Sequence, residues 1–87
     1  MRNDDALLRL HASDNVVISK GDMQAGTEIP ENGTLLNVTD AIPFGHKVAT
    51  AAIAKDEAVR KYGQIIGFAT RDIAPGEHVH EHNLVFA

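Results

Sequence analysis

The stretch DMQAGTEI, residues 22–29, recurs as DIAPGEHV at residues 72–79. Both copies open with aspartate and an aliphatic residue, carry glycine in the middle and close on a β-branched residue. Glycine adopts a positive φ without steric cost, so Gly26 and Gly76 are each predicted to turn the chain between two short strands. The sequence therefore predicts an internally repeated fold of strand, turn and strand.

A third, degraded copy is AIAKDEAV, residues 52–59, where Asp56 takes the place of the glycine. Local propensity over residues 52–63 also favours about two helical turns, but the repeat favours a turn, which we predict. A short helix over residues 3–12 has only weak support from its Asn and Asp start. We predict one domain, residues 1–87, that is all-β with at most one short helix.

Length and charge restrict the classes of function. A chain of 87 residues can build one modest core but is short for an enzyme that must also enclose its substrate, which favours a larger partner. Eight scattered Lys and Arg residues and a formal net charge of -4 argue against nucleic-acid binding. Without cysteine, a metal would need His, Asp or Glu ligands. The absence of a signal peptide or long apolar run predicts a cytoplasmic protein without a membrane partner.

The stretch HVHEHN, residues 78–83, places histidines at every second position. In an extended strand His78, His80 and His82 would share one face, where neighbouring imidazoles could converge on one metal ion. The alternative is a half-exposed strand surface that binds nothing. If the row belongs to an active site, His80 and His82 must approach another motif that lies far away in the sequence.

That other motif is IPFGHKVA, residues 42–49, in which a Pro-x-Gly loop delivers His46 and Lys47 just before an apolar strand. Lys47 beside His46 could hold a substrate carboxylate through charge-assisted hydrogen bonds, although the segment also reads as an ordinary solvated turn. The only tyrosine, Tyr62, is either a packed aromatic residue or a catalytic acid.

Three stretches occur together in one order: PFGHKVA (43–49), YGQIIGFAT (62–70) and IAPGEHVHEHN (73–83). With them, the chain from about residue 11 to 83 resembles the N-terminal SAF domain of the altronate/galactarate dehydratases, which also occurs as the small subunit of sulfolactate sulfo-lyase. The resemblance implies a SAF-type β-clip made of short curled hairpins. The chain departs from the family pattern at Asp56, where a turn glycine is usual, and at residues 50–52.

The resemblance also implies a chemistry, the elimination of a β substituent from a sugar acid or hydroxy acid. A base removes the proton next to the carboxylate, and a divalent metal such as Fe²⁺ or Mn²⁺ stabilises the enediolate. Most of this machinery is expected on a large dehydratase subunit or domain, so the chain alone is expected to be inactive. The residues implied are His46, Tyr62, His80 and His82 for catalysis, Lys47 and Asn83 for substrate binding, and His80 and His82 for the metal.

A different class of function is a stand-alone carbohydrate-binding SAF module without a catalytic role. Sugar recognition relies on aromatic platforms, and only 5% of this chain is aromatic, which favours the hydro-lyase reading. A third class is a structural dimerisation domain or other homo-oligomer, which would need an exposed apolar patch.

Overall fold

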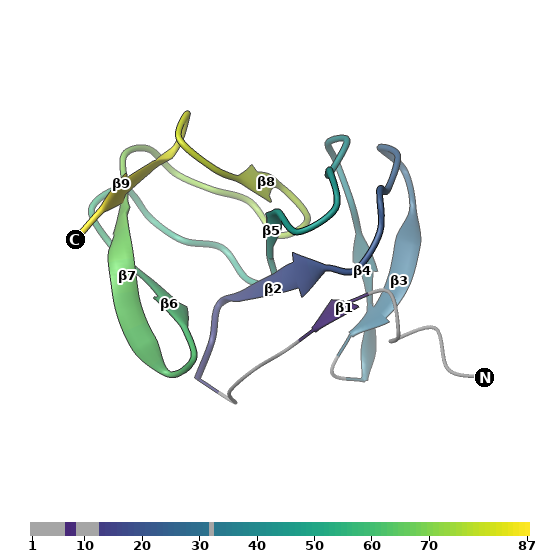
Figure 1. The fold of residues 1–87 in the computed structure, drawn as a ribbon, viewed down its shortest axis with the longest axis horizontal. Helices are drawn as coiled ribbons and strands as arrows, with labels where there is room; N and C mark the ends of the chain where they lie inside the picture. The colour runs from purple at the N-terminus through teal and green to yellow at the C-terminus, as the bar shows by residue number, and fades with distance from the viewer. Residues whose placement is uncertain (1–6, 9–12, 32) are drawn as a thin grey trace.

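The computed structural model describes residues 7–8, 13–31 and 33–87, and this part of the chain is all-β, as predicted (Figure 1). Its strands are β1 (Leu7–Leu8), β2 (Val16–Ser19), β3 (Glu28–Glu31), β4 (Thr34–Asn37), β5 (Lys47–Ala49), β6 (Ala58–Lys61), β7 (Gln64–Ala69), β8 (His78–Val79) and β9 (Leu84–Phe86). Within the described residues there is no helix long and apolar enough to cross a membrane. The weakly supported helix over residues 3–12 falls mostly outside the described residues, although Leu7 and Leu8 form β1.

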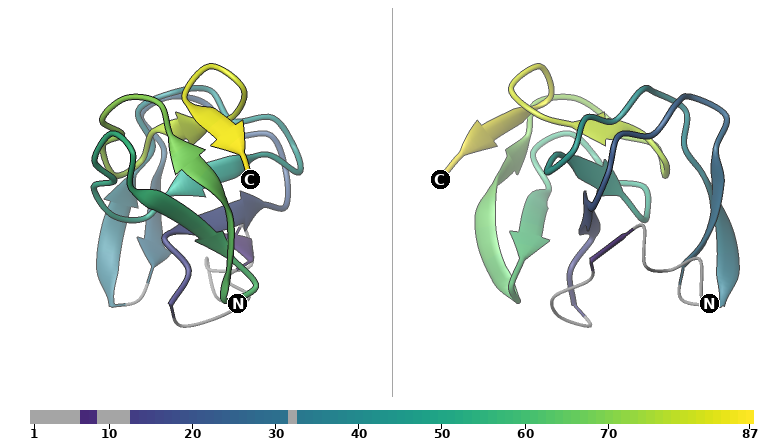
Figure 2. Two further views of the ribbon diagram at one scale, coloured as in Figure 1. Left: turned by 90° about the vertical axis from the view of Figure 1, so that its left-hand side faces the viewer. Right: turned by 45° about the vertical axis from the view of Figure 1, so that its right-hand side comes forward.

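The strands of the described residues form three antiparallel sheets. The sheet β1–β2–β5–β8 lies in the middle, with the hairpin β3–β4 on one side and the sheet β6–β7–β9 on the other (Figures 1 and 2). Because side chains alternate along a strand, both faces of β2 and β5 can be buried.

Each face of the central sheet packs against a different hydrophobic cluster. Val16 of β2 and Ala49 of β5 join the cluster that includes residues of β6, β7 and β9. Their neighbours Val17 and Val48 join the cluster that includes residues of β3 and β4. The core is therefore divided into two clusters that share the strands β2 and β5.

Four turns of the same construction show that the repeat is real. Positive φ occurs at Gly26 (92°), Gly45 (81°), Asp56 (72°) and Gly76 (87°). The backbone N–H groups of these residues donate, in that order, to the carbonyls of Val38, Ser19, Ala69 and Ala49 at 2.6 to 2.8 Å. The predicted turns at Gly26, Asp56 and Gly76 are confirmed. The segment of residues 52–63, where local propensity also favoured a short helix, therefore forms the predicted turn.

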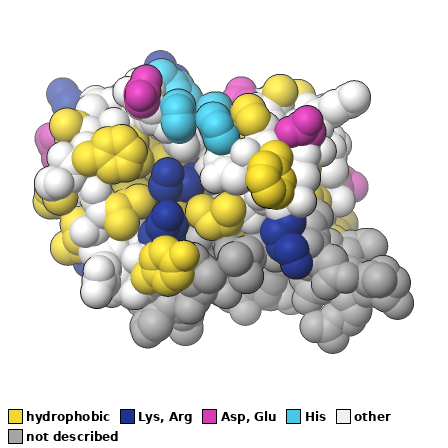
Figure 3. All heavy atoms as spheres, in the orientation of Figure 1, with side chains coloured by type: hydrophobic (Ala, Val, Ile, Leu, Met, Phe, Trp, Pro, Cys, Tyr) yellow, Lys and Arg dark blue, Asp and Glu magenta, His cyan; other side chains and the backbone are white. Residues whose placement is uncertain are grey.

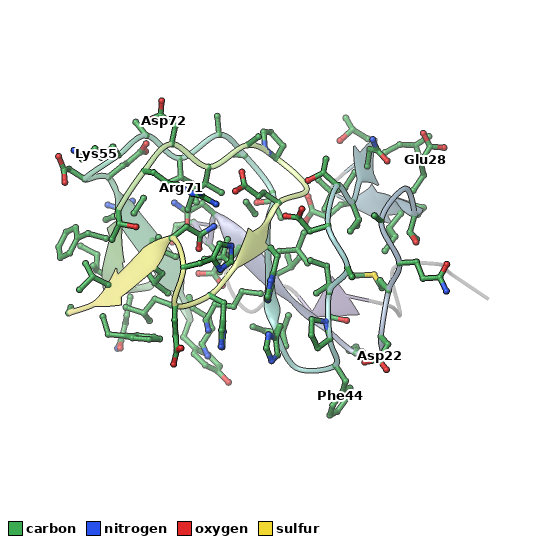
Figure 4. The ribbon with its side chains drawn as sticks, turned by 90° about the horizontal axis from the view of Figure 1, so that it is seen from above. Asp22, Glu28, Phe44, Lys55, Arg71 and Asp72 are labelled. Atoms are coloured by element: carbon green, nitrogen blue, oxygen red, sulfur yellow. The ribbon has the colours of Figure 1, made fainter. Side chains whose placement is uncertain are left out.

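The fourth copy, AIPFGHKV at residues 41–48, was not predicted; like the third copy, it opens with alanine in place of aspartate. The structure explains that difference, since the turns associate in pairs through the bridges Met23–Ile42 and Ile53–Ile73. In each pair one copy opens with an aspartate, whose carboxylate reaches the other turn. Asp22 Oδ1 accepts a hydrogen bond from the Phe44 N–H at 2.7 Å. Asp72 Oδ1 accepts from the Lys55 N–H at 2.9 Å. Figure 4 labels Asp22 next to Phe44 on one pair of turns and Asp72 next to Lys55 on the other.

Candidate functional site: a histidine cluster between β5 and β8

The register between β5 and β8 brings the two histidine motifs together. These strands pair antiparallel with Val48 opposite His78, and continuing that register past the strand ends sets His46 opposite His80. The rings of His46 and His80 stack with centroids 4.4 Å apart. His46 Nδ1 lies 2.9 Å from His78 Nε2, which is hydrogen-bonding distance. The expected approach of His80 to the loop that carries His46 is therefore present.

Three half-buried imidazoles converge on one point. One ring nitrogen from each of His46, His78 and His80 lies within 4.8 Å of the other two. Two nitrogens that bind one ion at about 2.1 Å each lie no more than about 4.2 Å apart, so small rotations of these rings would suffice for ligation. Three imidazoles suit a divalent transition metal and leave further coordination positions free.

The electrostatics around His78 favour the neutral form of its imidazole. Burial lowers the pKa of His78, and the nearby rings of His46, His82 and His80 lower it further, whereas Asp40 raises it. Asp40 Oδ2 also accepts a hydrogen bond from the His78 backbone N–H at 3.0 Å, which anchors β8 beside the cluster. A neutral imidazole has a ring nitrogen lone pair that can bind a metal or accept a proton.

The segment that follows His78 is not the regular strand that the alternation predicted. Strand β8 ends at Val79 and residues 81–83 form a turn, because the chain reverses there to enter β9. His82 is exposed, with its ring centroid 5.3 Å from that of His78. The converging nitrogens thus come from His46, His78 and His80, so His80 of the predicted pair belongs to this group and His82 does not.

Asn83 holds this turn in place. Its side chain is fully buried, its Oδ1 accepts from the His80 N–H at 2.9 Å, and its Nδ2 donates to the His78 carbonyl at 2.8 Å. The predicted role of Asn83 in substrate binding would require an exposed amide. The burial instead assigns this amide to positioning the two histidines.

Lys47 and Tyr62 differ in their relation to the cluster. Lys47 is half-buried next to His46, and burial lowers its pKa, with a smaller contribution from the charge of Lys61. Tyr62 is 62% exposed at the tip of the β6–β7 hairpin, where its backbone N–H donates to Asp14. Figure 1 places this tip on the opposite side of the molecule from the turn after β8. Among the described residues, the Tyr62 ring lies 5.2 Å from the Lys61 amine, and the ring contacts of the histidines are with one another.

The histidine side chains reach the molecular surface. Figure 3 shows them at the upper rim of one face, next to Lys and Arg side chains and flanked by hydrophobic ones. The site residues implied by the family resemblance did not include His78 or Asp40, although His78 belonged to the predicted row of histidines. The β5–β8 pairing would have revealed His78, but it joins residues 32 positions apart in the sequence, as the contact between His46 and His78 shows.

Comparison with known proteins identifies close relatives. Residues 5–87 match the family described as Altronate/galactarate dehydratase SAF domain. The chain is 38% identical over 78 residues to the altronate dehydratase of Bacillus subtilis (strain 168), covering 90% of this chain and 16% of that protein. It is 36% identical over 80 residues to the galactarate dehydratase (L-threo-forming) of Escherichia coli (strain K12), covering 90% of this chain and 15% of that protein.

A smaller relative matches over most of its own length. This is the (2R)-sulfolactate sulfo-lyase subunit alpha of Chromohalobacter salexigens, which is 44% identical over 68 residues, covering 77% of this chain and 72% of that subunit. The chain thus spans about a sixth of the two dehydratases but most of the subunit.

Proposed function

Since the chain belongs to the altronate/galactarate dehydratase SAF domain family, we propose that it completes the active site of a larger sugar-acid hydro-lyase. In this proposal the chain is a small subunit or domain that works with a large catalytic dehydratase part in the cytoplasm. It contributes side chains to a pocket that its own 87 residues are too few to enclose.

The observation that carries the proposal is the convergence of His46, His78 and His80 from two separate motifs. A strand that served only to build the sheet has no need for three imidazoles that face one another. Half-buried, mutually close titratable groups are typical of sites where protons or ligands are exchanged. The cluster also lies at the surface, where a larger partner could close over it.

The residues present fit a divalent metal such as Fe²⁺ or Mn²⁺, held by the three converging imidazoles. When bound, such an ion would act as a Lewis acid toward the carboxylate and hydroxyl oxygens of a sugar acid. Lys47 would bind the substrate carboxylate by charge-assisted hydrogen bonds. The exposed ring of His82 would accept or return a proton at a ring nitrogen, next to the cluster.

Asn83 would act by fixing the turn that carries these histidines. Tyr62 could contribute only as a contact to the larger part, because the hairpin tip keeps it away from the cluster. This revises the catalytic role that the family resemblance implied for it.

The test is turnover of galactarate and altronate by the chain assembled with its large catalytic subunit. The 87-residue chain alone should show no turnover. The double variant His80→Ala with His82→Ala should lose turnover in the assembly, with assembly itself checked by gel filtration. Lys55→Gln, on an exposed turn, serves as the matched control and should remain active.

Metal binding gives a second readout. Titration of the isolated chain with Mn²⁺ should broaden the NMR signals of His46, His78 and His80 first. Full activity of the double variant would refute the active-site role. It would favour the alternative of a carbohydrate-binding module, which needs neither the histidines nor a metal.

A further inference from the structure

The exposed apolar side chains of this chain gather on one sheet. Of the seven large hydrophobic residues that are exposed in the described part of the chain, five lie on β6–β7–β9 or at its hairpin: Tyr62, Ile65, Phe68, Val85 and Phe86. Phe68 and Val85 lie directly opposite each other on β7 and β9, so they share one face, where they are 40% and 54% exposed. Contiguous exposed apolar surface of this kind marks an interaction site.

Strand β9 has the composition of an interior strand but the position of an edge strand. Its sequence, LVF, is apolar on both faces, which is typical of a strand that is buried on both faces. It pairs with β7 on one side, and no strand within the residues that the structure describes pairs with its other side. Phe86, which points to the face opposite Val85, is 57% exposed. A strand added to this edge would cover both faces.

The opposite edge of the same sheet is already closed. Along β6, Asn15 Nδ2 donates to the Ala58 carbonyl at 2.9 Å, and its Oδ1 accepts from the Arg60 N–H at 2.8 Å, so a side chain takes the place of a neighbouring strand. Along β9, the Ala87 N–H donates to a β7 carbonyl at 3.0 Å. Because bonded and non-bonded pairs alternate in an antiparallel ladder, the N–H and C=O of the preceding residue, Phe86, point away from β7. These groups are available to pair with an added strand.

This open edge adjoins the histidine cluster. Strand β9 directly follows the turn of residues 81–83, which comes immediately after His80. The amine of Lys47, the residue next to His46, lies 5.8 Å from the centroid of the Phe86 ring. In the orientation of Figure 1, Figure 3 shows hydrophobic side chains over the β7 and β9 side of the molecule, next to the histidines. A partner bound along β9 would therefore lie beside the imidazoles.

We propose that β9 and the exposed side chains of Phe68, Val85 and Phe86 form the surface on which the large catalytic part docks. The segment that docks is extended, pairs with the backbone of Phe86 and carries apolar residues on both of its faces. The inference rests on the proposed function and deepens it, because it names the interface through which the larger part closes over the histidines.

A larger partner suits this surface better than a second copy of the chain does. The matched region makes up about a sixth of two dehydratases, and in the sulfo-lyase relative it makes up most of a protein that is named as a subunit. A second copy would bring the same histidines and not the missing part of a pocket. Two copies, each with a net charge of -4, would also repel each other.

The first test measures the affinity of the 87-residue chain for the large catalytic subunit by titration calorimetry. Val85→Lys sets a charge in the apolar interface and should raise the dissociation constant at least about tenfold, because that charge would be buried without a partner. Leu35→Lys makes the same change on β4, at a position that is 65% exposed, and should leave the dissociation constant unchanged. Circular dichroism checks that both variants fold. Equal affinities of the two variants would overturn the interface.

The second test examines the strand pairing itself. Phe86→Ala and Phe86→Pro both remove the ring, but only proline also removes the N–H that points away from β7. Phe86→Pro should therefore bind the large subunit more weakly than Phe86→Ala. In the unaltered chain, hydrogen exchange of the Phe86 amide should slow at least about tenfold on assembly, because the added strand protects it. A Phe86 amide that exchanges equally fast in the assembly would refute the added strand.

These outcomes separate the interface from the proposed function. Val85→Lys impairs docking and not chemistry, so a saturating concentration of this variant should restore turnover. The double variant His80→Ala with His82→Ala should dock normally and lose turnover at every concentration. Normal docking of Val85→Lys with an inactive double variant would refute the interface and leave the proposed function intact. Protection of the Phe86 amide in the isolated chain that grows with its concentration would identify a second copy as the occupant and overturn the inference.

Discussion

Asn83 determines the geometry of the turn that follows His78. It is completely buried. Its side-chain oxygen accepts a hydrogen bond from the backbone N–H of His80, and its side-chain nitrogen donates one to the backbone carbonyl of His78. We expect Asn83→Ala to lower the free energy of unfolding by about 2–3 kcal/mol, because a buried donor and acceptor lose their partners. Urea denaturation followed by circular dichroism measures this. The neighbouring His82→Ala, at an exposed position, should change stability by less than about 0.5 kcal/mol.

Asn83→Asp refines this prediction. Aspartate retains an oxygen for the His80 N–H but has no N–H to donate to the His78 carbonyl, so its effect on stability should differ from that of alanine. If Asn83→Ala were as stable as the unaltered chain, the amide would have no role in holding the turn, and a direct contact with substrate would again be the better explanation.

The shifted pKa of His78 gives a pH dependence with a definite sign. Burial and the neighbouring imidazoles lower this pKa below its ordinary value of 6.5. Between the folded-state pKa and 6.5 the unfolded chain therefore binds more protons than the folded chain, so the free energy of unfolding rises with pH through that window. Urea midpoints measured across it should rise less in His78→Asn than in the unaltered chain. An equal rise in both would exclude His78 as the source.

At the scale of elements, the turns are the part of the fold that the sequence predicts best. A glycine or aspartate in a short polar stretch between β-branched runs indicates a positive φ locally, and the turns at Gly26, Asp56 and Gly76 follow. Strand ends are less predictable because distant partners decide them. The alternation in residues 78–82 favours one continuous strand, whereas the chain must reverse after His80 so that β9 can pair with β7.

Two of these turns differ in how tightly their surroundings are packed. Replacing their glycines by alanine should therefore lower the free energy of unfolding by different amounts. Gly26 and Gly76 share a similar φ, but a Cβ on Gly26 would meet nothing within 4 Å, whereas one on Gly76 would lie 1.9 Å from the Asn37 carbonyl oxygen. Gly26→Ala should lower the free energy of unfolding by about 1 kcal/mol, the penalty of the backbone conformation alone. Gly76→Ala should lower it by at least about 2 kcal/mol more, because the backbone at Asn37 must move to make room for the Cβ.

Thermal unfolding of both variants measures that difference. Equal losses would mean that the segment around Asn37 can yield freely, and that the Gly76 turn is not packed against β4 as the structure has it.

At the scale of the molecule, the candidate site depends on a long-range pairing that no local pattern encodes. The motifs with His46 and His80 are recognisable in the sequence, but their meeting depends on the register of β5 against β8. That register follows from the central sheet, whose strands β2 and β5 bury side chains on both faces. Sequence reasoning could therefore name most of the histidines, but it could not tell which three of them converge.

The shared central sheet predicts that the whole molecule unfolds as one unit. Leu36 on β4 belongs to one hydrophobic cluster. Tyr62, the only tyrosine in a chain without tryptophan, follows directly after β6, whose Val59 belongs to the other cluster. Leu36→Ala should lower the free energy of unfolding by about 2–4 kcal/mol, because it leaves a cavity in the core. If β2 and β5 couple the clusters, the urea midpoint seen by Tyr62 fluorescence should fall by the same amount as that seen by circular dichroism.

Leu35→Ala, at a neighbouring position that is 65% exposed, should leave both midpoints nearly unchanged. A biphasic transition in which the Tyr62 midpoint does not move would mean that the two clusters fold independently, and that the histidine site between β5 and β8 does not depend on the β3–β4 hairpin.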